Sequence, residues 1–317
     1  MPTGNSFTNI ITGKNNEKFL LKKFDPNREY YFLHEYFINK YLFKLKKKYV
    51  AKIKKIDKKK FQIFYEFFPQ EKKIDIGYSS EYLQLIKSIH TEAKEQKIDF
   101  MIYAKEAFTS ISNTLINIKD RLNKILNIKN KDNKELINHV DNLSYFLNIL
   151  EKNIACKNLF SSEIFNHADS GLHNCILNNK DQLLINDLEY AGLDSPIKQC
   201  IDYLLHPKNK NDELTNEAWL DYFINNCINE KDLENLNFYF SLFALKWSII
   251  LLNEFIPEVW NTRIFAYPLR INKHDTILKN QLEKSKLYLE AAKKIIDNER
   301  TTKLFSKSQK IFISKSY

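Results

Sequence analysis

Two carboxylates and one amide lie close together in the sequence, each next to a short apolar stretch. Asp169 lies in a polar loop, Asn174 directly precedes Cys175-Ile176-Leu177, and Asp187 follows Leu183-Leu184-Ile185 after one intervening residue. Oxygen atoms of such side chains are the ligands that Mg²⁺ prefers, together with water and substrate phosphates. If the fold brings the three side chains together, they would form a site for divalent-cation chemistry on phosphates.

The residues between the two apolar stretches predict a tight hairpin. Asn178-Asn179-Lys180-Asp181 supplies the Asn and Asp residues that favour a turn between two strands. A hairpin of this length places Asn174 and Asp187 near one another at the same end, with Asp169 on the loop just before it. We therefore expect three oxygen-bearing side chains to converge at the open end of the hairpin.

The order of these residues resembles that of a known family. His167, Asp169 and Asn174 fit the pattern H-x-D-x-x-x-x-N, and the segment that begins at Asp187 reads D-x-E-Y-A-G, with Glu189, Tyr190 and Gly192. Together they resemble the catalytic loop and the metal-binding Asp of the protein-kinase-like superfamily. The two sequence patterns are similar to those of its aminoglycoside phosphotransferase and choline kinase branch.

The resemblance implies a role for each residue. Asp169 would accept or orient the proton of a substrate hydroxyl, as the catalytic residue. Asn174 and Asp187 would bind the Mg²⁺ that bridges the phosphates of ATP. His167 would hold the loop, and Asp202, on the next helix, would accept backbone N–H bonds from that loop.

A kinase-like site also needs a lysine on a strand of the N-terminal sheet and a glutamate on the following helix. Lys22 ends the apolar strand Phe19-Leu20-Leu21 and would contact the α and β phosphates. Lys23 competes for this role, because side chains alternate along a strand and only one of the two can face the phosphates. On the helix we favour Glu35, since it lies deeper in the helix than Glu29.

The other nucleotide contacts are predicted from their position in the chain. The sequence contains neither G-x-G-x-x-G nor the P-loop pattern. Ser6, which follows Gly4-Asn5 just before the first strand, is therefore the expected phosphate contact. The segment around Phe67 falls where the hinge of such a fold binds the adenine edge through backbone groups.

The hydrophobic pattern indicates which elements position these residues. It predicts the order β-β-α-β-β near the N-terminus, with strands at 6–12, 18–24, 49–56 and 60–68 and a helix that opens at Asp25-Pro26-Asn27. Helical spacing follows at 82–90, 100–126, 135–153 and from 197 to about 297. We expect an α+β, bilobal protein-kinase-like fold: a nucleotide-binding lobe at residues 1–70, with a small antiparallel sheet and one helix, and a mainly helical catalytic and substrate-binding lobe at 71–317.

The amino-acid composition argues against several classes of partner and of protein. The chain has 317 residues and a formal net charge of +10, but its lysines are spread along a sequence that is also rich in Ile and Asn, which argues against a nucleic-acid partner. The four cysteines show no C-x-x-C pairing, so neither zinc nor disulfides are expected. No apolar stretch approaches the roughly 20 residues of a membrane span, and no signal peptide is recognised. A cytoplasmic protein without a membrane partner follows.

The expected function is therefore ATP- and Mg²⁺-dependent transfer of the γ-phosphate to a hydroxyl of a small molecule. A sugar, amino sugar or aminoglycoside-like acceptor is the first expectation. A choline- or ethanolamine-type amino alcohol is the alternative, because aromatic and acidic residues after position 208 could receive a cationic amine. A catalytically silent pseudokinase that binds a ligand is the other alternative. The sequence leaves the oligomeric state and the choice between ATP and GTP open.

Overall fold

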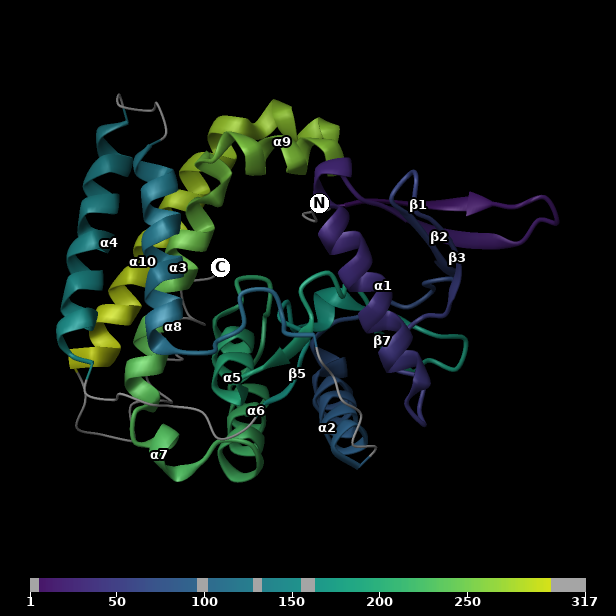
Figure 1. Ribbon diagram of the computed structural model, residues 1–317, viewed down its shortest axis with the longest axis horizontal. Coiled ribbons are helices and arrows are strands. Elements are labelled where there is room, and N and C mark those ends of the chain that lie inside the picture. The colour runs from purple at the N-terminus through teal and green to yellow at the C-terminus, as the bar shows by residue number, and fades with distance from the viewer. Residues whose placement is uncertain (1–5, 96–101, 128–132, 155–162, 298–317) are drawn as a thin grey trace. The chain divides into compact units, whose positions relative to one another are not determined.

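The computed structural model describes residues 6–95, 102–127, 133–154 and 163–297 (Figure 1). The chain folds into two compact units. The first unit contains Met1–Lys105, Ile164–Leu193 and Thr262–Arg270, and the second contains Glu106–Glu163, Asp194–Asn261 and Ile271–Tyr317. The lobe boundary expected near residue 70 falls inside the first unit and stays a prediction.

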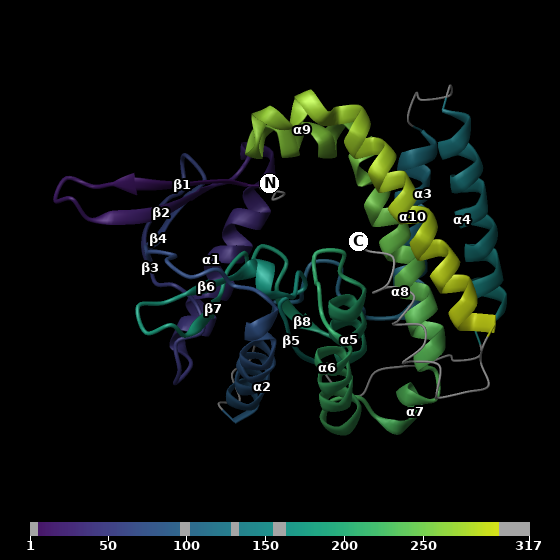
Figure 2. The ribbon, with the colours of Figure 1, turned by 180° about the vertical axis from the view of Figure 1, so that it is seen from behind.

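The first unit begins with a four-stranded antiparallel sheet. Its strands are β1 (Phe7–Thr12), β2 (Lys18–Lys23), β3 (Ile53–Asp57) and β4 (Gln62–Glu66), in the spatial order β1-β2-β4-β3. Figure 2 shows β4 between β2 and β3. The β1–β2 hairpin pairs Thr8 with Lys22, and β2 pairs Lys22 with Ile63 of β4. The predicted order of elements along the chain, two strands, a helix and two strands, is confirmed.

Helix α1 (Glu29–Lys44) follows β2 after one short 3-10 turn, η1 (Pro26–Arg28). The turn begins at Asp25, whose carboxylate accepts a hydrogen bond from the backbone N–H of Asn27, as a capping residue does. The helix buries a face that includes Phe32, which packs with Ile63 and Tyr65 of β4 in one hydrophobic cluster. Burial of each such side chain stabilises the fold by about 1.5–3 kcal/mol.

The rest of the first unit places the predicted hairpin and its flanking loops. It contains η2 (Ile76–Tyr78), α2 (Ser79–Glu95), β5 (Ile164–Asn166), η3 (Leu172–Asn174), β6 (Cys175–Leu177), β7 (Leu183–Ile185) and the start of β8 (Gly192–Asp194). β6 and β7 pair antiparallel, with Cys175 opposite Ile185. The hairpin expected from the sequence is confirmed with the same strands.

Gly192 has a steric reason to be glycine. A Cβ atom at this position would lie 2.4 Å from the backbone nitrogen of Ala104 and 2.5 Å from the carbonyl carbon of Tyr103. The backbone N–H of Ala104 donates to the carbonyl of Leu193 at 2.9 Å, and Tyr103 forms a β-bridge with Leu193. The two backbones approach so closely that a side chain cannot be accommodated.

The pairing of residues 102–105 with the chain at 190–193 shows that one predicted helix begins later than expected. The periodicity of 100–126 predicted one long helix, but α3 (Ile111–Leu126) begins only at Ile111, with the Ser110 hydroxyl as its cap. Of the preceding stretch, the described residues 102–105 are engaged by the chain at 190–193, for example through the Lys105 N–H bond to the Tyr190 carbonyl. Tertiary pairing thus overrides the local helical pattern there.

The second unit is helical. Besides α3 it contains α4 (Lys134–Lys152), α5 (Pro196–Leu205), α6 (Glu213–Asn226), α7 (Glu230–Leu233), α8 (Leu236–Leu251), η4 (Leu252–Phe255) and α10 (His274–Asp297). Helix α9 (Pro257–Ala266) and η5 (Pro268–Lys273) belong partly to each unit. In this unit α8 packs most extensively against α10, and the Ser241 hydroxyl of α8 donates to the Ala292 carbonyl of α10.

The stretch Leu236–Phe255 has the length and composition of a membrane span, with a mean hydropathy of 1.3. The expectation that no apolar stretch approaches this length is therefore wrong. However, 72% of the stretch is buried within the protein. It also carries Lys246, whose ammonium group lies 3.1 Å from a carboxylate oxygen of Glu106. These features are those of a core helix.

Asp202 has different partners from those that the resemblance implied. Its carboxylate pairs with Lys198 at 2.7 Å and accepts a hydrogen bond from the Trp247 indole at 2.9 Å. Asp194 is a buried aspartate that does accept backbone N–H bonds, from Phe108 at 2.7 Å and from Ser195 at 2.8 Å. Both aspartates support the second unit by satisfying buried donors.

Glu106 links two cations of the second unit. Its carboxylate bonds to Arg121 of α3 and lies 3.1 Å from Lys246 of α8. Burial alone would raise the pKa of Glu106, but Lys246 and Arg121 outweigh it and lower the pKa to about 2. The ion pair therefore stabilises the folded state above pH 4.5, and this contribution is lost as the pH falls from 4.5 toward about 2.

We predict that Glu106→Gln lowers the free energy of unfolding by about 3 kcal/mol at pH 7, because it leaves the Lys246 charge buried without its carboxylate. Urea denaturation measures the loss. The variant should also lose less stability than the native chain between pH 4.5 and 3. Glu135→Gln is the control, since Glu135 forms an exposed pair with Lys286. Equal stability of the two variants would contradict this assignment.

Candidate active site

Lys22 is surrounded by carboxylates. It lies near the end of β2, and its side chain is only 4% exposed. Its ammonium group bonds to Glu35 of α1, lies 2.6 Å from Asp187 Oδ1 and lies 3.9 Å from Glu189 Oε2. Three acidic side chains from two distant parts of the sequence thus share one buried lysine.

The charge of Lys22 is held in place by these neighbours. Burial opposes the charge, but the carboxylates of Asp187, Glu35 and Glu189 outweigh burial and keep the pKa of Lys22 above its ordinary value. Lys23 points elsewhere, because the strand alternates: its ammonium group lies 5.9 Å from the centre of the Phe265 ring. The structure therefore brings the first of the two candidate lysines to the acidic residues.

Glu35 is the glutamate of α1 that meets the lysine. It is 1% exposed, and its second oxygen accepts a hydrogen bond from the Tyr65 hydroxyl of β4 at 2.5 Å. Both oxygens of the carboxylate therefore have a donor. Glu29, the competing residue, lies exposed in the first turn of the helix.

The loop before the hairpin holds Asp169 and Asn174 together. The Asn174 amide donates to the carboxylate and to the backbone carbonyl of Asp169, both at 2.8 Å. His173 lies 3.5 Å from the other oxygen of the Asp169 carboxylate. Ala168 adopts φ 65°, a left-handed conformation that is unusual for alanine. Such a conformation persists where the surrounding structure fixes the chain.

His167 connects this loop to Asp187. Its Nε2 lies 2.8 Å from the carbonyl of Asn186 and 3.2 Å from that of Asp187. Carbonyl oxygens only accept hydrogen bonds, so Nε2 carries the proton, and burial lowers the pKa of His167 and favours the neutral ring. The Asn186 N–H in turn donates to the Asn174 carbonyl at 2.8 Å. These bonds place Asn174 and Asp187 at the same end of the hairpin.

Sequence reasoning did not identify how Glu189 takes part. Its carboxylate is 2% exposed, faces Lys22 and lies 3.4 Å from Arg28. Arg28 also donates to the Tyr190 hydroxyl at 2.9 Å. The signal was available as the two-residue spacing of Asp187 and Glu189. However, strand alternation alone does not show that both face one lysine, since the chain turns at Asp187, where φ is 59°.

One of the three carboxylates, that of Asp187, is placed to bind a divalent cation as well as Lys22. One oxygen from each of Glu35, Asp187 and Glu189 lies within 4.8 Å of the others. Asp187 is the accessible member, with 26% of its side chain exposed. Carboxylate and amide oxygens suit Mg²⁺, which keeps water and phosphate ligands as well. Glu35 and Glu189 face Lys22, so Asp187 and the Asn174 side chain, at the same end of the hairpin, are the donors that fit the metal predicted from the sequence.

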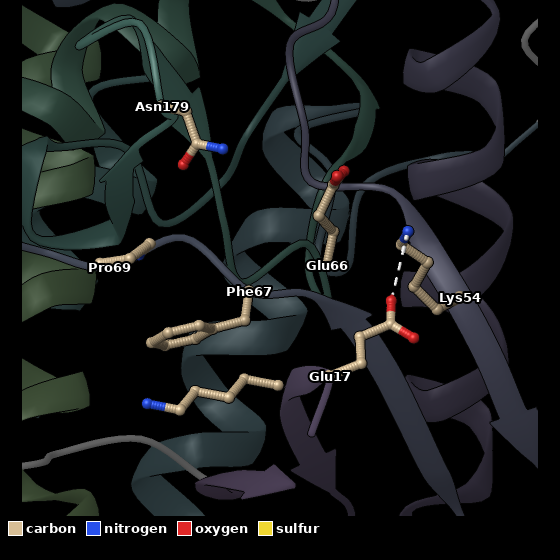
Figure 3. Close-up of a pocket in the computed structure, with 7 residues that line it drawn as sticks. Glu17, Lys54, Glu66, Phe67, Pro69 and Asn179 are labelled. Atoms are coloured by element: carbon tan, nitrogen blue, oxygen red, sulfur yellow. Dashed lines mark ion pairs between the residues drawn. The ribbon is translucent and has the colours of Figure 1, made fainter. Parts of the chain in front are cut away.

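The predicted hinge borders a pocket. A cavity of about 400 Å³ is lined by residues from the starts of β2 and β3, from the end of β4 and the residues after it, and from the β6–β7 turn, namely Glu17, Lys18, Lys54, Glu66, Phe67, Pro69 and Asn179 (Figure 3). Phe67 lies there, directly after β4. Ser6 is half-buried and directly precedes β1, whereas Gly4 and Asn5 lie outside the described residues. Their contacts with a nucleotide stay predictions.

We predict that Lys22→Ala lowers the free energy of unfolding at pH 8 by about 3–5 kcal/mol, since it leaves buried carboxylates without their cation. The loss should shrink toward pH 5, because burial raises the pKa of Glu35 to about 7 and this carboxylate can then take up a proton. Denaturant unfolding at the two pH values measures both effects. Lys23→Ala is the matched control on the other face of the strand. An equally large loss of stability in the control, or a loss that does not depend on pH, would argue against the ion pairs of Lys22 with its carboxylates.

No protein-family model matches the sequence, and no curated protein matches it. Solved structures do match the fold. The choline kinase LicA from Streptococcus pneumoniae is 15% identical, with 90% of this chain and 89% of that chain covered and a TM-score of 0.53. A choline/ethanolamine kinase family protein from Mesorhizobium loti is 12% identical, with 93% and 87% covered and a TM-score of 0.53.

The APH(2")-IIa protein, solved in its complex with gentamicin, is 13% identical, with 91% of this chain and 89% of that chain covered and a TM-score of 0.51. These matches confirm the fold predicted from the sequence motif. The chain has the α+β, protein-kinase-like fold that these three structures share.

Proposed function

We propose that the protein is an ATP-dependent phosphotransferase that acts on a hydroxyl group of a small molecule. The observation that supports this most is the buried Lys22, which meets Glu35 and Asp187 beside the loop of Asp169 and Asn174. A lysine–glutamate pair and a metal-binding aspartate are the parts that kinase-type phosphoryl transfer requires. The fold is that of structures named as kinases.

Two further observations support a nucleotide as the phosphate donor. LicA has been solved in complex with AMP, and the amicoumacin kinase hAmiN with AMP-PNP and Ca²⁺, and both have the fold of this chain, with TM-scores of 0.54 and 0.50. In this chain, the backbone after β4 at Phe67 and the phosphate contact at Ser6 are the proposed nucleotide contacts. Mg²⁺ is the proposed metal, with Asp187 and Asn174 as its ligands.

The chain's own residues would promote the reaction by aligning the reacting groups and by stabilising their charge. The acceptor oxygen bonds to the γ-phosphorus while the bond from that phosphorus to the β–γ bridging oxygen breaks, so ADP leaves and the hydroxyl proton passes to Asp169. Bound Mg²⁺ would supply neutralisation of phosphate charge. Asn174 fixes the Asp169 carboxylate through its amide. Lys22 stays charged, and Glu35 holds it against β4 through Tyr65.

The acceptor is proposed only as a class. A sugar or amino sugar is one candidate, and a choline- or ethanolamine-type amino alcohol is the other, because both kinds of kinase share the fold. The proposed partner is thus a soluble small molecule. A silent pseudokinase would bind the nucleotide without turnover. The presence of Asp169, Asn174 and Asp187 together favours the enzyme.

We predict that the purified protein consumes ATP only with Mg²⁺ and a suitable acceptor, in a screen of sugars, amino sugars, sugar phosphates, sugar acids and amino alcohols. Asp169→Asn should lower kcat by about 10²-fold or more while Mg²⁺–ATP still binds, because it removes the proton acceptor. Asp187→Asn should weaken Mg²⁺-dependent ATP binding itself. ADP release and calorimetry measure the two effects.

Asp181→Asn is the matched control, since this aspartate lies exposed in the β6–β7 turn. A native chain that binds Mg²⁺–ATP but shows no ATP consumption with any acceptor would favour the pseudokinase. Full activity of Asp169→Asn would contradict the proposed mechanism.

A further inference from the structure

The β6–β7 hairpin needs support from outside, because the two strands form a sheet of their own. A two-stranded hairpin alone is at best marginally stable in water. Asn174 directly precedes β6, and Asp187 follows two residues after the end of β7. Whatever fixes the outer edges of the two strands therefore also fixes the two proposed metal ligands.

The outer edge of β7 is held by the main chain that leads into β3. The Ile185 N–H donates to the Tyr49 carbonyl at 2.7 Å, and Ile185 forms a parallel β-bridge with Val50. The Tyr49 hydroxyl in turn donates to the Glu92 carboxylate of α2 at 2.7 Å. Backbone pairing of the ordinary kind thus secures this side of the hairpin.

The outer edge of β6 is paired by a side chain instead. The Leu177 N–H donates to Gln70 Oε1 at 3.0 Å, and Gln70 Nε2 donates to the Leu177 carbonyl, also at 3.0 Å. The amide of Gln70 therefore engages both backbone groups of Leu177, as a residue of a neighbouring strand would. Leu177 is 3% exposed, and a buried backbone group without a partner costs free energy.

The same amide nitrogen also holds the segment that follows β4. Gln70 Nε2 donates to the Phe68 carbonyl at 3.1 Å, which is possible because an amide nitrogen carries two hydrogens. Pro69 lies between the two residues; its ring fixes its own φ and restricts Phe68 to an extended conformation. A stiff segment thus presents Gln70, and one side chain connects this segment to β6.

The two connected segments face each other across the cavity beside the predicted hinge. Phe67 and Pro69 line the cavity from the segment after β4, and Asn179 lines it from the β6–β7 turn (Figure 3). Gln70 directly follows Pro69 in the chain, and Leu177 lies two residues before Asn179. The bonds of Gln70 therefore hold these two walls of the cavity together.

An ion pair spans the same two segments but contributes less. Lys72 lies 2.5 Å from Asp181 of the β6–β7 turn, and the two side chains are 57% and 58% exposed. Exposed ion pairs of this kind are screened by water and salt and stabilise little. The three hydrogen bonds of Gln70, two of them to a buried residue, are the stronger connection.

We propose that Gln70 is a positioning residue, whose amide sets the hairpin that carries Asn174 and Asp187 at a fixed distance from the backbone at Phe67. The proposal rests on the proposed function, in which Phe67 contacts the base and the other two residues hold the metal on the phosphates. A ligand that spans both contacts binds more tightly when their separation is fixed in advance. A ligand that reaches only one contact gains nothing from it.

Three ligands test this difference. Adenosine reaches only the base contact, Mg²⁺–tripolyphosphate reaches only the metal contact, and Mg²⁺–ATP spans both. Calorimetry of the full chain measures each Kd. We expect Gln70→Ala to raise the Kd of Mg²⁺–ATP about tenfold, and KM for ATP with it, while the other two Kd values change by less than about twofold. The reason is that the substitution alters the separation of the contacts and neither contact itself.

Two further variants locate the effect. Gln70→Glu keeps an acceptor for the Leu177 N–H but turns a carboxylate oxygen toward two carbonyls, so it should weaken Mg²⁺–ATP binding at least as much. Gln84→Ala, which removes an exposed glutamine from α2, is the control. Thermal unfolding establishes that each variant is folded. Equal weakening of all three ligands, or unchanged binding of Mg²⁺–ATP, would overturn the inference and leave the proposed function standing.

A measurement without nucleotide separates the inference from the proposed function. Hydrogen exchange of the Leu177 amide in the full chain reports its bond to Gln70, with the Ile185 amide on the other edge of the hairpin as the internal reference. We expect Gln70→Ala to speed exchange at Leu177 about tenfold relative to Ile185. This result in a chain that does not bind Mg²⁺–ATP would support the positioning by Gln70, and only the proposed function would fail. Unchanged exchange at Leu177 would overturn the inference.

Discussion

The buried ammonium group of Lys22 is the interaction on which the candidate site depends. Three carboxylates cannot be brought this close in a buried place without a cation, because their mutual repulsion and the loss of water would both oppose it. Lys22 supplies that cation from β2, while Glu35 comes from α1 and Asp187 and Glu189 from the chain after β7. One side chain therefore fixes the positions of the sheet, the helix and the hairpin within the first unit.

A second set of contacts positions α1 so that Glu35 can reach Lys22. The helix and the 3-10 turn before it contact the segment at 189–191 at several points: Arg28 of η1 bonds to Tyr190, the Tyr31 ring lies 5.3 Å from the Tyr190 ring, and His34 Nε2 lies 2.5 Å from the Ala191 carbonyl. Gly192 has no side chain, so the backbone at 102–105 can pass directly against this segment. The D-x-E-Y-A-G segment thus positions Glu35 as well as supplying carboxylates.

Much of this could be predicted from the sequence, and the reasons are local. The family resemblance pointed to Lys22 and Glu35 as candidates on a strand and a helix that the local pattern predicted, and the Asn- and Asp-rich turn predicted the β6–β7 hairpin correctly. The role of Glu189 and the start of α3 at Ile111 were not predicted. Each depends on pairing between residues far apart in the chain, which local periodicity does not encode.

The central claim is that Asp187 and Asn174, next to Lys22, form a metal site for a nucleotide. Crystals of the protein grown with Mn²⁺ and a non-hydrolysable ATP analogue would test it most directly, through the anomalous scattering of manganese. The account predicts a manganese peak within coordination distance of Asp187 and Asn174, with the nucleotide phosphates beside it. Manganese and nucleotide bound away from both residues, with Lys22 still enclosed by its carboxylates, would contradict it.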